Sequence, residues 1–373
     1  MLYTENIESS EIQRVDILKA NEEPEWNLFV SSHPDATIYH SLKYIKILTN
    51  ESGMENINLV YRDTNGKIKG ILPLLYTRGV PFGFGGLPGS KRLSSLPRTP
   101  AAGPLATSDE VRNALIDKAI ELVDKERGYR LQLKMTEEIL NFNRNKFKQI
   151  KWRETYLFEI PSEGEELRFG NSRNHSAIKR AVGKAMRSGL TIKTVTSLDQ
   201  LKAWYSMYLE TMSFHVTPAR SFDFFKNLWE ALAPQKLMWV DLAVLNETEV
   251  LAGSVFLASN DTVIYGFNGS KRDLFDFRPN DLLHWNAIHL AQKQGYRYYD
   301  MGEVQADHEG LAAYKSKWCN LTKTIYHYYY PVDEKNIEVS IDTAPSGKAK
   351  KIIWNMVPHT LTEIMGKVIY KYL

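Results

Sequence analysis

The chain has 373 residues, of which 43% are hydrophobic and 24% are charged, a composition typical of a globular protein rather than a disordered or collagen-like one. This length suffices for two ordinary domains, each with its own core. The formal net charge of +3 is too small to indicate nucleic-acid binding by itself, and the single cysteine, Cys319, excludes an internal disulfide and a multi-cysteine zinc site. The first residues lack the basic and apolar regions of a signal peptide, and nothing resembles a membrane span, so we expect a cytoplasmic protein.

The first half of the sequence contains the pattern of a helical pair, a strand pair and then a helix followed by a strand. Apolar residues at helical spacing around Trp26 and over residues 39–48 predict the helical pair. Residues 58–75 predict two antiparallel strands joined at an Asn-Gly dipeptide, which is typical of a tight hairpin turn. Residues 111–133 predict an amphipathic helix that stops at a glycine, and a strand after it.

Residues 79–104, between the strand pair and the helix, are rich in glycine and proline. They contain the sequence GFGG, which looks like part of a dinucleotide-binding fingerprint. No helix begins directly after it, however, so the pattern does not favour that function. We expect a surface loop here, either a plain connection or a loop that shapes a substrate cleft.

Residues 172–189 predict a basic amphipathic helix in the middle of the chain. Its apolar residues share one face, while Arg180, Lys184 and Arg187 share another. Such a basic stripe is either a solvated helix face or a track for the phosphates of CoA or tRNA, and the sequence leaves both interpretations open.

The second half repeats the element order of the first. Residues 198–212 and 222–232 predict a helical pair, and residues 241–258 predict a strand pair. After a polar connection over residues 268–280, a helix begins at a proline, stops at a glycine and leads into the strand 296–301. Because the same order occurs twice, the sequence predicts an internal duplication of one fold.

The C-terminal stretch, residues 348–373, combines clustered lysines with apolar residues, and Pro358 divides it into two short helices. It could dock against the body of the protein or lie on a membrane surface, which would suit a lipid-linked acceptor. The sequence does not decide between these two interpretations.

Two segments of the second half resemble a known family. The run PNDLLHWNAIHLAQKQGYRYYDMG and the later GLAAYKSKW are similar to the FemAB-like, BioF2-like acyltransferases of the GNAT superfamily, in which an Asp-Phe-Gly strand precedes a Phe-Lys-x-x-Trp-Gly motif. This chain has Met301 in place of the phenylalanine of that strand, Tyr314 before the motif lysine, and Cys319 in place of the last glycine. After the strand it has Glu303-Val304-Gln305, where relatives often have a basic residue and serine, which puts the acceptor-side chemistry in doubt.

The resemblance implies an α/β (α+β) fold of two tandem GNAT-like domains, each a mixed, mainly antiparallel sheet flanked by helices. It divides the chain into a first domain at 1–160, a basic connecting helix at 161–189, a second domain at 190–335 and a helical tail at 336–373. It further implies an N-acyltransferase that moves an acyl or aminoacyl group from acyl-CoA or aminoacyl-tRNA to an amine. Fitting acceptors are small molecules and the glycan or peptide precursors of the cell envelope and of polysaccharides, and no metal is required. A non-catalytic binding module of the same fold is the alternative.

The expected catalytic residues follow from the motif and from their places on the predicted elements. In Fem-type transferases the motif lysine, here Lys315, is implicated at the donor end of the site, where its charge would face the reacting oxygen or the donor phosphates. Asp300 would orient a base or the amine, or instead cap the following turn. Glu303, just beyond the strand, has a similar claim, and Tyr265 is a candidate hydroxyl in the cleft, with packing as its simpler interpretation.

Donor phosphates have two candidate places. One is the connection into the helix that begins at residue 279, because free backbone N–H groups at a helix N-terminus favour anions. Its expected phosphate-binding residues are Lys271, Arg272, Arg278 and Asn280. The other place is the basic helix, with Arg180, Lys184 and Arg187.

Overall fold

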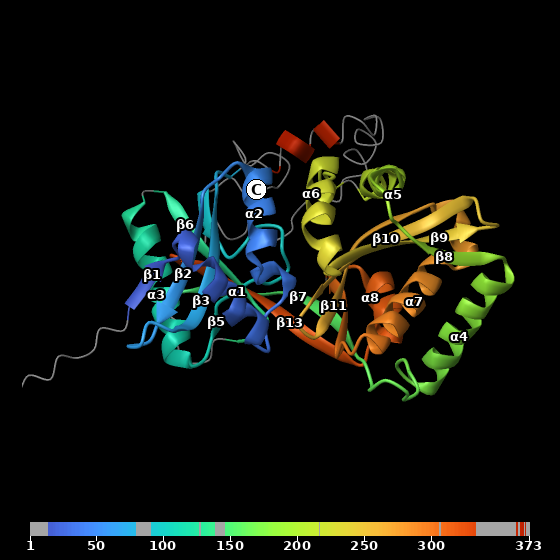
Figure 1. The fold of residues 1–373 in the computed structure, drawn as a ribbon, viewed down its shortest axis with the longest axis horizontal. Helices are drawn as coiled ribbons and strands as arrows, with labels where there is room; N and C mark the ends of the chain where they lie inside the picture. The colour runs from blue at the N-terminus through green and yellow to red at the C-terminus, as the bar shows by residue number, and fades with distance from the viewer. Residues whose placement is uncertain are drawn as a thin grey trace, which may run out of the picture.

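The computed structural model describes residues 14–79, 91–126, 128–138, 146–215, 217–305 and 307–332, and residues 363, 364, 366–368 and 370 near the C-terminus. The helices and strands form two successive halves joined by a long helix, α4 (Ser172–Arg187). Figure 1 shows the halves side by side along the long axis of the molecule, with α4 at the outer edge of the second half.

The two halves have similar element orders, which among the described residues differ by one short strand in the first half and one helix in the second. In the first half the elements are β1 (Arg14–Ile17), α1 (Glu23–Ser32), α2 (Leu42–Ser52), β2 (Asn56–Arg62), β3 (Ile68–Thr77), β4 (Lys91–Ser94), β5 (Leu105–Ala106), α3 (Asp109–Lys125), β6 (Tyr129–Met135) and β7 (Lys148–Glu159). In the second half they are β8 (Leu190–Thr194), α5 (Leu198–Phe214), α6 (Phe222–Leu232), β9 (Met238–Leu245), β10 (Glu249–Ser259), β11 (Thr262–Ser270), α7 (Pro279–Lys293), β12 (Tyr298–Val304), α8 (Glu309–Trp318) and β13 (Leu321–Tyr330). Short 3-10 turns include η2 (Ile38–His40) and η5 (Arg272–Phe277).

Local sequence explains where several helices begin. The N-cap residues Ser108, Asn171, Ser197 and Ser221 each accept a hydrogen bond from a backbone N–H of the first turn of α3, α4, α5 and α6, respectively. Such a bond satisfies one of the donors that a helix N-terminus leaves without an intrahelical partner. Helix α7 instead begins with a proline at its first position, where the missing N–H costs nothing.

The described strands form one sheet of 13 strands, in the order β1-β2-β3-β4-β6-β13-β7-β12-β11-β10-β9-β8, with β5 paired to β3. The pairs β4–β6 and β11–β12 are parallel and occupy equivalent places in the two halves. At the centre the halves exchange strands: β13 pairs with β6 and β7, and β7 lies between β13 and β12. One continuous sheet therefore runs through both halves.

Helices cover both faces of this sheet. On one face, α1 and α2 of the first half and α5 and α6 of the second pack into a single core that includes Trp26, Ile45, Trp204 and Phe225. The other face carries two separate cores, one under α3 and one under α4, α7 and α8. The first face thus joins the halves, and we call it the shared face and the opposite one the divided face.

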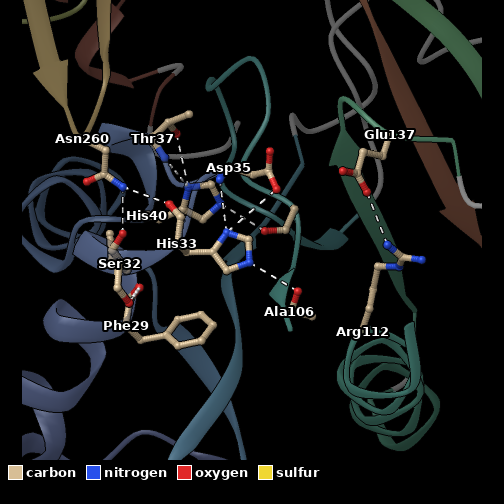
Figure 2. Close-up of polar contacts among 12 residues, drawn as sticks. Phe29, Ser32, His33, Asp35, Thr37, His40, Ala106, Arg112, Glu137 and Asn260 are labelled. Atoms are coloured by element: carbon tan, nitrogen blue, oxygen red, sulfur yellow. Dashed lines mark hydrogen bonds and ion pairs between the residues drawn. The ribbon is translucent and has the colours of Figure 1, made fainter. Parts of the chain in front are cut away.

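The turn between β10 and β11 adds a polar contact between the halves, drawn in Figure 2. Asn260 donates from Nδ2 to the backbone oxygens of Val30 (2.9 Å) and His33 (3.0 Å) at the end of α1. Nearby, His33 Nε2 lies 3.3 Å from the backbone oxygen of Ala106. His40 Nε2 lies 3.1 Å from the backbone oxygen of Gly103. Burial lowers the pKa of His40 to about 4, so this ring is neutral at pH 7.

The described residues of the C-terminal tail dock against the body of the protein. Lys367 forms an ion pair with Asp223 at 3.2 Å, and the Tyr370 hydroxyl donates to the Pro218 oxygen at 3.1 Å. The rest of the stretch 348–373 lies outside the described residues. Among the helices that the structure describes, none is both long and apolar enough to cross a membrane.

The predicted α/β architecture, with a mainly antiparallel sheet flanked by helices in two successive units, is confirmed. One expectation for the first half is wrong in part, because residues 79–104 are not all loop: Lys91–Ser94 form β4, which pairs with β3 and β6. Residues 80–90 of that segment, which include GFGG, lie outside the described residues. The domain boundaries at 160, 189 and 335 stay a prediction, since β7 and β13 pair across the halves.

Candidate active site

The parallel strands β11 and β12 separate partway along their length. They pair at three positions, from Thr262 with Tyr298 to Ile264 with Asp300, and no pairing follows. On the other side of β11, Gly266 is an extra residue in the pairing with β10, and such a bulge bends a strand. The result is a gap in the sheet that opens directly after Ile264 and Asp300.

A second bulge lies in β12 at this gap. Asp300 pairs with Leu157 of β7 and Glu303 pairs with Thr155, so two residues of β12 face one residue of β7. In a regular strand, residues three apart point to opposite faces, but this extra residue turns the Asp300 and Glu303 side chains to the same face. Gly302 supplies the required backbone conformation, with φ of 80°, which side chains other than glycine rarely adopt.

Helix α8 places the Lys315 ammonium against this bulge. The Nζ atom donates to the backbone oxygens of Gly302 (3.1 Å) and Glu303 (3.2 Å), and the side chain is buried. An ammonium has three N–H donors, so one remains for another acceptor in the gap. Burial lowers the pKa of Lys315 to about 8, while the nearby Asp300 and Glu303 carboxylates oppose the shift. At neutral pH the group is therefore mostly charged, and a modest rise in pH neutralises it.

Both carboxylates of β12 are held by side chains of β7. Asp300 Oδ1 accepts from Thr155 Oγ1 at 2.6 Å and from the Gly302 N–H at 2.7 Å. Glu303 Oε1 accepts from Arg153 Nη1 at 2.6 Å. Burial raises the pKa of Asp300, although these two hydrogen bonds lower it in part.

Aromatic side chains lie beneath the gap on the divided face. The Tyr265 ring centroid is 4.6 Å from that of His284, which also contacts Tyr314 and Trp318. His284 Nδ1 lies 2.7 Å from the Tyr299 hydroxyl. Burial, helped by the nearby Lys315 charge, lowers the pKa of His284 to about 3, so it is neutral at pH 7. Tyr265 is thus part of a packed aromatic wall beside Lys315, and burial raises its pKa.

The equivalent gap in the first half is closed by its own side chains. Beyond the last pair of β4 and β6, the backbone N–H of Lys134 donates to Ser95 Oγ at 2.8 Å. The Lys134 ammonium then donates to the oxygens of Leu96 (2.9 Å) and Thr99 (3.3 Å). Burial lowers the pKa of Lys134 to about 7. These contacts bridge the two strands, so the gap of the second half is the better place for a substrate.

The connection expected to hold donor phosphates makes mostly internal contacts. Lys271 pairs with Glu249 at 3.0 Å, and the Arg272 guanidinium lies 3.5 Å from the Phe214 ring centroid. Asn280 Oδ1 accepts from Asn268 and Ser270, both at 3.1 Å. Arg278 caps α7 in a left-handed conformation with φ of 61°, where glycine is usual.

The N-terminus of α7 also carries a carboxylate of its own. Asp281, the third residue of the helix, accepts from the Tyr314 hydroxyl at 3.5 Å, and burial raises its pKa. In its charged form this group would repel a phosphate at the helix N-terminus.

Helix α4, by contrast, exposes its cations. Ile178, Val182 and Ala185 are buried against α7 and α8, and the opposite face is solvent-exposed. The helix contains no acidic residue, and no ion pair to a described residue involves its exposed cations, which are Arg173, Lys179, Arg180, Lys184 and Arg187. The expected residues of the basic stripe therefore lie together on one exposed surface beside α8.

In the structure, Lys315, Asp300, Glu303 and Tyr265 lie together at the gap, and their catalytic roles stay predictions. The sequence did not point to Arg153 and Thr155, which reach the site from the other half. No signal in the sequence identifies them, because they enter through the pairing of β7 with β12. Among the described residues, no group of three or more His, Cys, Asp or Glu side chains could hold a metal ion.

A family model for the acetyltransferase (GNAT) domain matches residues 172–316, from α4 to α8. The chain thus contains a GNAT acyltransferase domain, and the FemAB-like resemblance fits this fold. The match includes the gap between β11 and β12 and the residues Lys315, Asp300, Glu303 and Tyr265. No curated protein sequence matches the chain.

Several solved structures share the fold over most of the chain. The crystal structure of FemX has a TM-score of 0.68 and 18% identity, and it covers 87% of this chain and 99% of its own. A conserved protein of unknown function from Bacteroides thetaiotaomicron has a TM-score of 0.58, 10% identity, and coverage of 86% and 100%. L-PGS from Bacillus licheniformis has a TM-score of 0.52, 11% identity, and coverage of 83% and 96%. At these identities the likeness concerns the fold alone.

Proposed function

We propose that this protein is an N-acyltransferase that moves an acyl or aminoacyl group from an activated ester or thioester to an amine. The observation that carries the proposal is the buried Lys315 ammonium in the gap between β11 and β12. Its two bonds to the Gly302 and Glu303 carbonyls fix its position, and its third N–H is available to a substrate oxygen. A fixed cation in a buried site stabilises developing negative charge more strongly than it would in water.

The reaction requires little more than this cation and a base. The neutral amine attacks the donor carbonyl, the N–C bond forms, and the carbonyl electron pair moves onto oxygen beside Lys315. A base removes a proton from the nitrogen, and one of the β12 carboxylates, Asp300 or Glu303, serves this role. The bond to the ester oxygen or thioester sulfur then breaks, and the leaving group takes up a proton.

The two faces of the sheet separate the two substrates. Lys315, Tyr265 and the N-terminus of α7 lie on the divided face, so we assign the donor to that side. Asp300 and Glu303 point to the shared face, where both halves contribute, so the acceptor amine approaches from there. We therefore assign the first half to the acceptor side, and its closed gap supports this choice.

For the donor we favour aminoacyl-tRNA. The exposed cations of α4 would contact a polyanion, and α4 packs against α8, which carries Lys315. Internal contacts of Lys271, Arg272 and Asn280, and the Asp281 carboxylate, disfavour the α7 N-terminus as a pyrophosphate site. The sharing of a fold with FemX and L-PGS is consistent with this choice.

Acyl-CoA is the second candidate donor, because the match over residues 172–316 is to an acetyltransferase model. For the acceptor we propose an amine of a cell-envelope or polysaccharide precursor, as in the FemAB-like family. The matching location is the cytoplasm, and contact of the C-terminal tail with the inner face of the membrane would suit a lipid-linked acceptor.

The affinities for tRNA and for CoA, each measured at two salt concentrations, distinguish between the two candidate donors. If α4 contacts four or five phosphates, affinity for tRNA falls about a hundredfold or more between 50 and 200 mM salt, whereas affinity for CoA changes far less. The double variant Arg180→Gln/Lys184→Gln should weaken tRNA binding and flatten this dependence. The matched control is Lys118→Gln/Lys125→Gln on α3, whose lysines pair with Glu121. A tRNA affinity that does not change with salt would exclude tRNA as the donor carrier.

Transfer itself is tested with purified protein, tRNA charged with radiolabelled amino acids, acetyl-CoA in a parallel reaction, and an extract of envelope precursors. We expect label to appear in an amide product with one of the two donors. If neither donor gives a product that depends on Lys315, the proposed function is wrong.

A further inference from the structure

The two carboxylates at the gap differ in what their oxygens already bind. Asp300 Oδ1 accepts from Thr155 Oγ1 and from the backbone N–H of Gly302, two residues further along the chain. A bond from a residue to the N–H two positions later is the usual way in which an aspartate stabilises a tight turn. Asp300 therefore holds the shape of the β12 bulge.

Glu303 has one oxygen engaged and one without a partner. Its Oε1 accepts from Arg153 Nη1 at 2.6 Å, while Oε2 is buried and has no hydrogen-bond donor among the described residues. The side chain as a whole is 22% exposed, so it borders solvent, although Oε2 itself is covered. Because a buried carboxylate oxygen without a donor is unfavourable, its presence in a folded protein points to a donor that arrives with the substrate.

We propose that Glu303 is the base that receives the proton of the attacking nitrogen, and that Arg153 of β7 is the positioning residue that orients its carboxylate. This proposal rests on the proposed acyl transfer and assigns its proton step. Arg153 lies in the strand that the first half contributes to the centre of the sheet. The site of the second half would then be incomplete without the first.

The proton step follows from the contacts. After the N–C bond forms, the nitrogen carries a positive charge and an N–H that points to Glu303 Oε2. The proton moves to Oε2, the nitrogen becomes neutral, and the carboxyl is uncharged while Arg153 stays bound to Oε1. Collapse of the intermediate breaks the bond to the leaving group, and the carboxyl then releases its proton to the leaving group or to solvent.

Several titratable groups besides Arg153 lie near Glu303. Lys315 of α8, Lys134 of β6 and Tyr39 of η2 all lie within electrostatic reach of it. Arg153 is the closest cation, and its removal takes away the positive charge that is hydrogen-bonded to the carboxylate.

The first experiment compares Glu303→Gln with Asp300→Asn in single-turnover transfer. Both variants keep the size and an acceptor oxygen, so each preserves its bond to Arg153 or to Gly302. We expect Glu303→Gln to lower the transfer rate at least a hundredfold with donor affinity unchanged, and Asp300→Asn to lower it less than tenfold. The reverse order would overturn the assignment to Glu303 and leave the acyltransferase function intact.

A second experiment separates the chemical role from a structural one. Formate is a small carboxylate, and we expect it to restore part of the activity of Glu303→Ala; absence of rescue in a folded variant argues against the base. Arg153→Lys should keep most of the rate, whereas Arg153→Met should shift the loss of activity at low pH to a higher pH. If the pH profile of Arg153→Met is the same as that of the wild type, Arg153 does not have the proposed role. If the wild-type protein transfers nothing from any donor, the proposed function fails, and the assignment of Glu303 fails with it.

Discussion

Replacement of Lys315 by methionine separates the catalytic role of this residue from its structural one. Methionine has a similar length and no charge, so it fills the same buried space without the ammonium. Loss of one fixed donor to a developing oxyanion lowers kcat by about 10²–10³, or about 3–4 kcal/mol in the activation barrier. We expect a loss of this size in transfer, with a smaller change in donor affinity.

The effect on stability should be small, because two contributions of opposite sign meet at this position. The shift of the Lys315 pKa from 10.5 to about 8 corresponds to an unfavourable contribution of about 3 kcal/mol at neutral pH, which the substitution removes. The substitution also leaves the Gly302 and Glu303 carbonyls without their donor, at about 1–3 kcal/mol each. The net change in unfolding free energy should therefore stay within about 2–3 kcal/mol.

The assay measures single-turnover transfer and urea unfolding on the same preparations. Lys317→Met is the matched control, since Lys317 lies on the same helix and is exposed. The reasoning is refuted if Lys315→Met keeps activity within threefold of wild type. It is also refuted if the variant unfolds several kcal/mol more easily, because the loss of activity would then follow from the loss of structure.

Three further predictions concern the bulge in β12, the Asn260 contact between the halves and the pH dependence of stability. Gly302→Ala should destabilise the protein by about 1–2 kcal/mol in urea unfolding, because a side chain is strained at this φ, and should slow transfer at least tenfold. Gly310→Ala, where an added Cβ meets nothing, is the control, and equal effects of the two would contradict the role of the bulge. Asn260→Gly keeps the left-handed turn but removes two hydrogen bonds between the halves, so we expect the free energy of unfolding to fall by about 1–3 kcal/mol. Asn246→Gly, in the β9–β10 turn, is the control and should leave the free energy of unfolding unchanged. Finally, the folded-state pKa of Lys315 lies below its unfolded value, so unfolded chains bind more protons between about pH 8 and 10.5, and the stability of wild type relative to Lys315→Met should rise over this range. A flat or falling difference would mean that the ammonium is not destabilised by burial.

Local patterns predicted much of the fold. The helical spacing predicts α6 at residues 222–232, as the structure has it, and the Pro279 start of α7 is also confirmed. The strand pairs on either side of their short turns follow from alternation and turn residues. These features depend on neighbours in sequence, which is why a single sequence suffices for them.

The contacts between the halves could not be predicted in the same way. Arg153 and Glu303 are 150 positions apart, and their meeting depends on β7 lying between β13 and β12. The bulge in β12 further decides which face each carboxylate occupies, and one extra residue in a strand leaves no clear mark in a sequence. The sequence did not predict strand β4, because it is only four residues long and lies within a segment rich in glycine and proline.

The exchange of β7 and β13 also affects the order in which the chain folds during synthesis. When β7 leaves the ribosome, neither of its sheet partners exists yet, and β6 still has a free edge where β13 will lie. The hydrogen bond from Gln132 to Tyr329 spans 197 positions, so the first half cannot complete its sheet until nearly the whole chain has been made. Its unpaired strand edges stay exposed for that time, and we expect nascent chains that end before Leu321 to be the form most prone to aggregate.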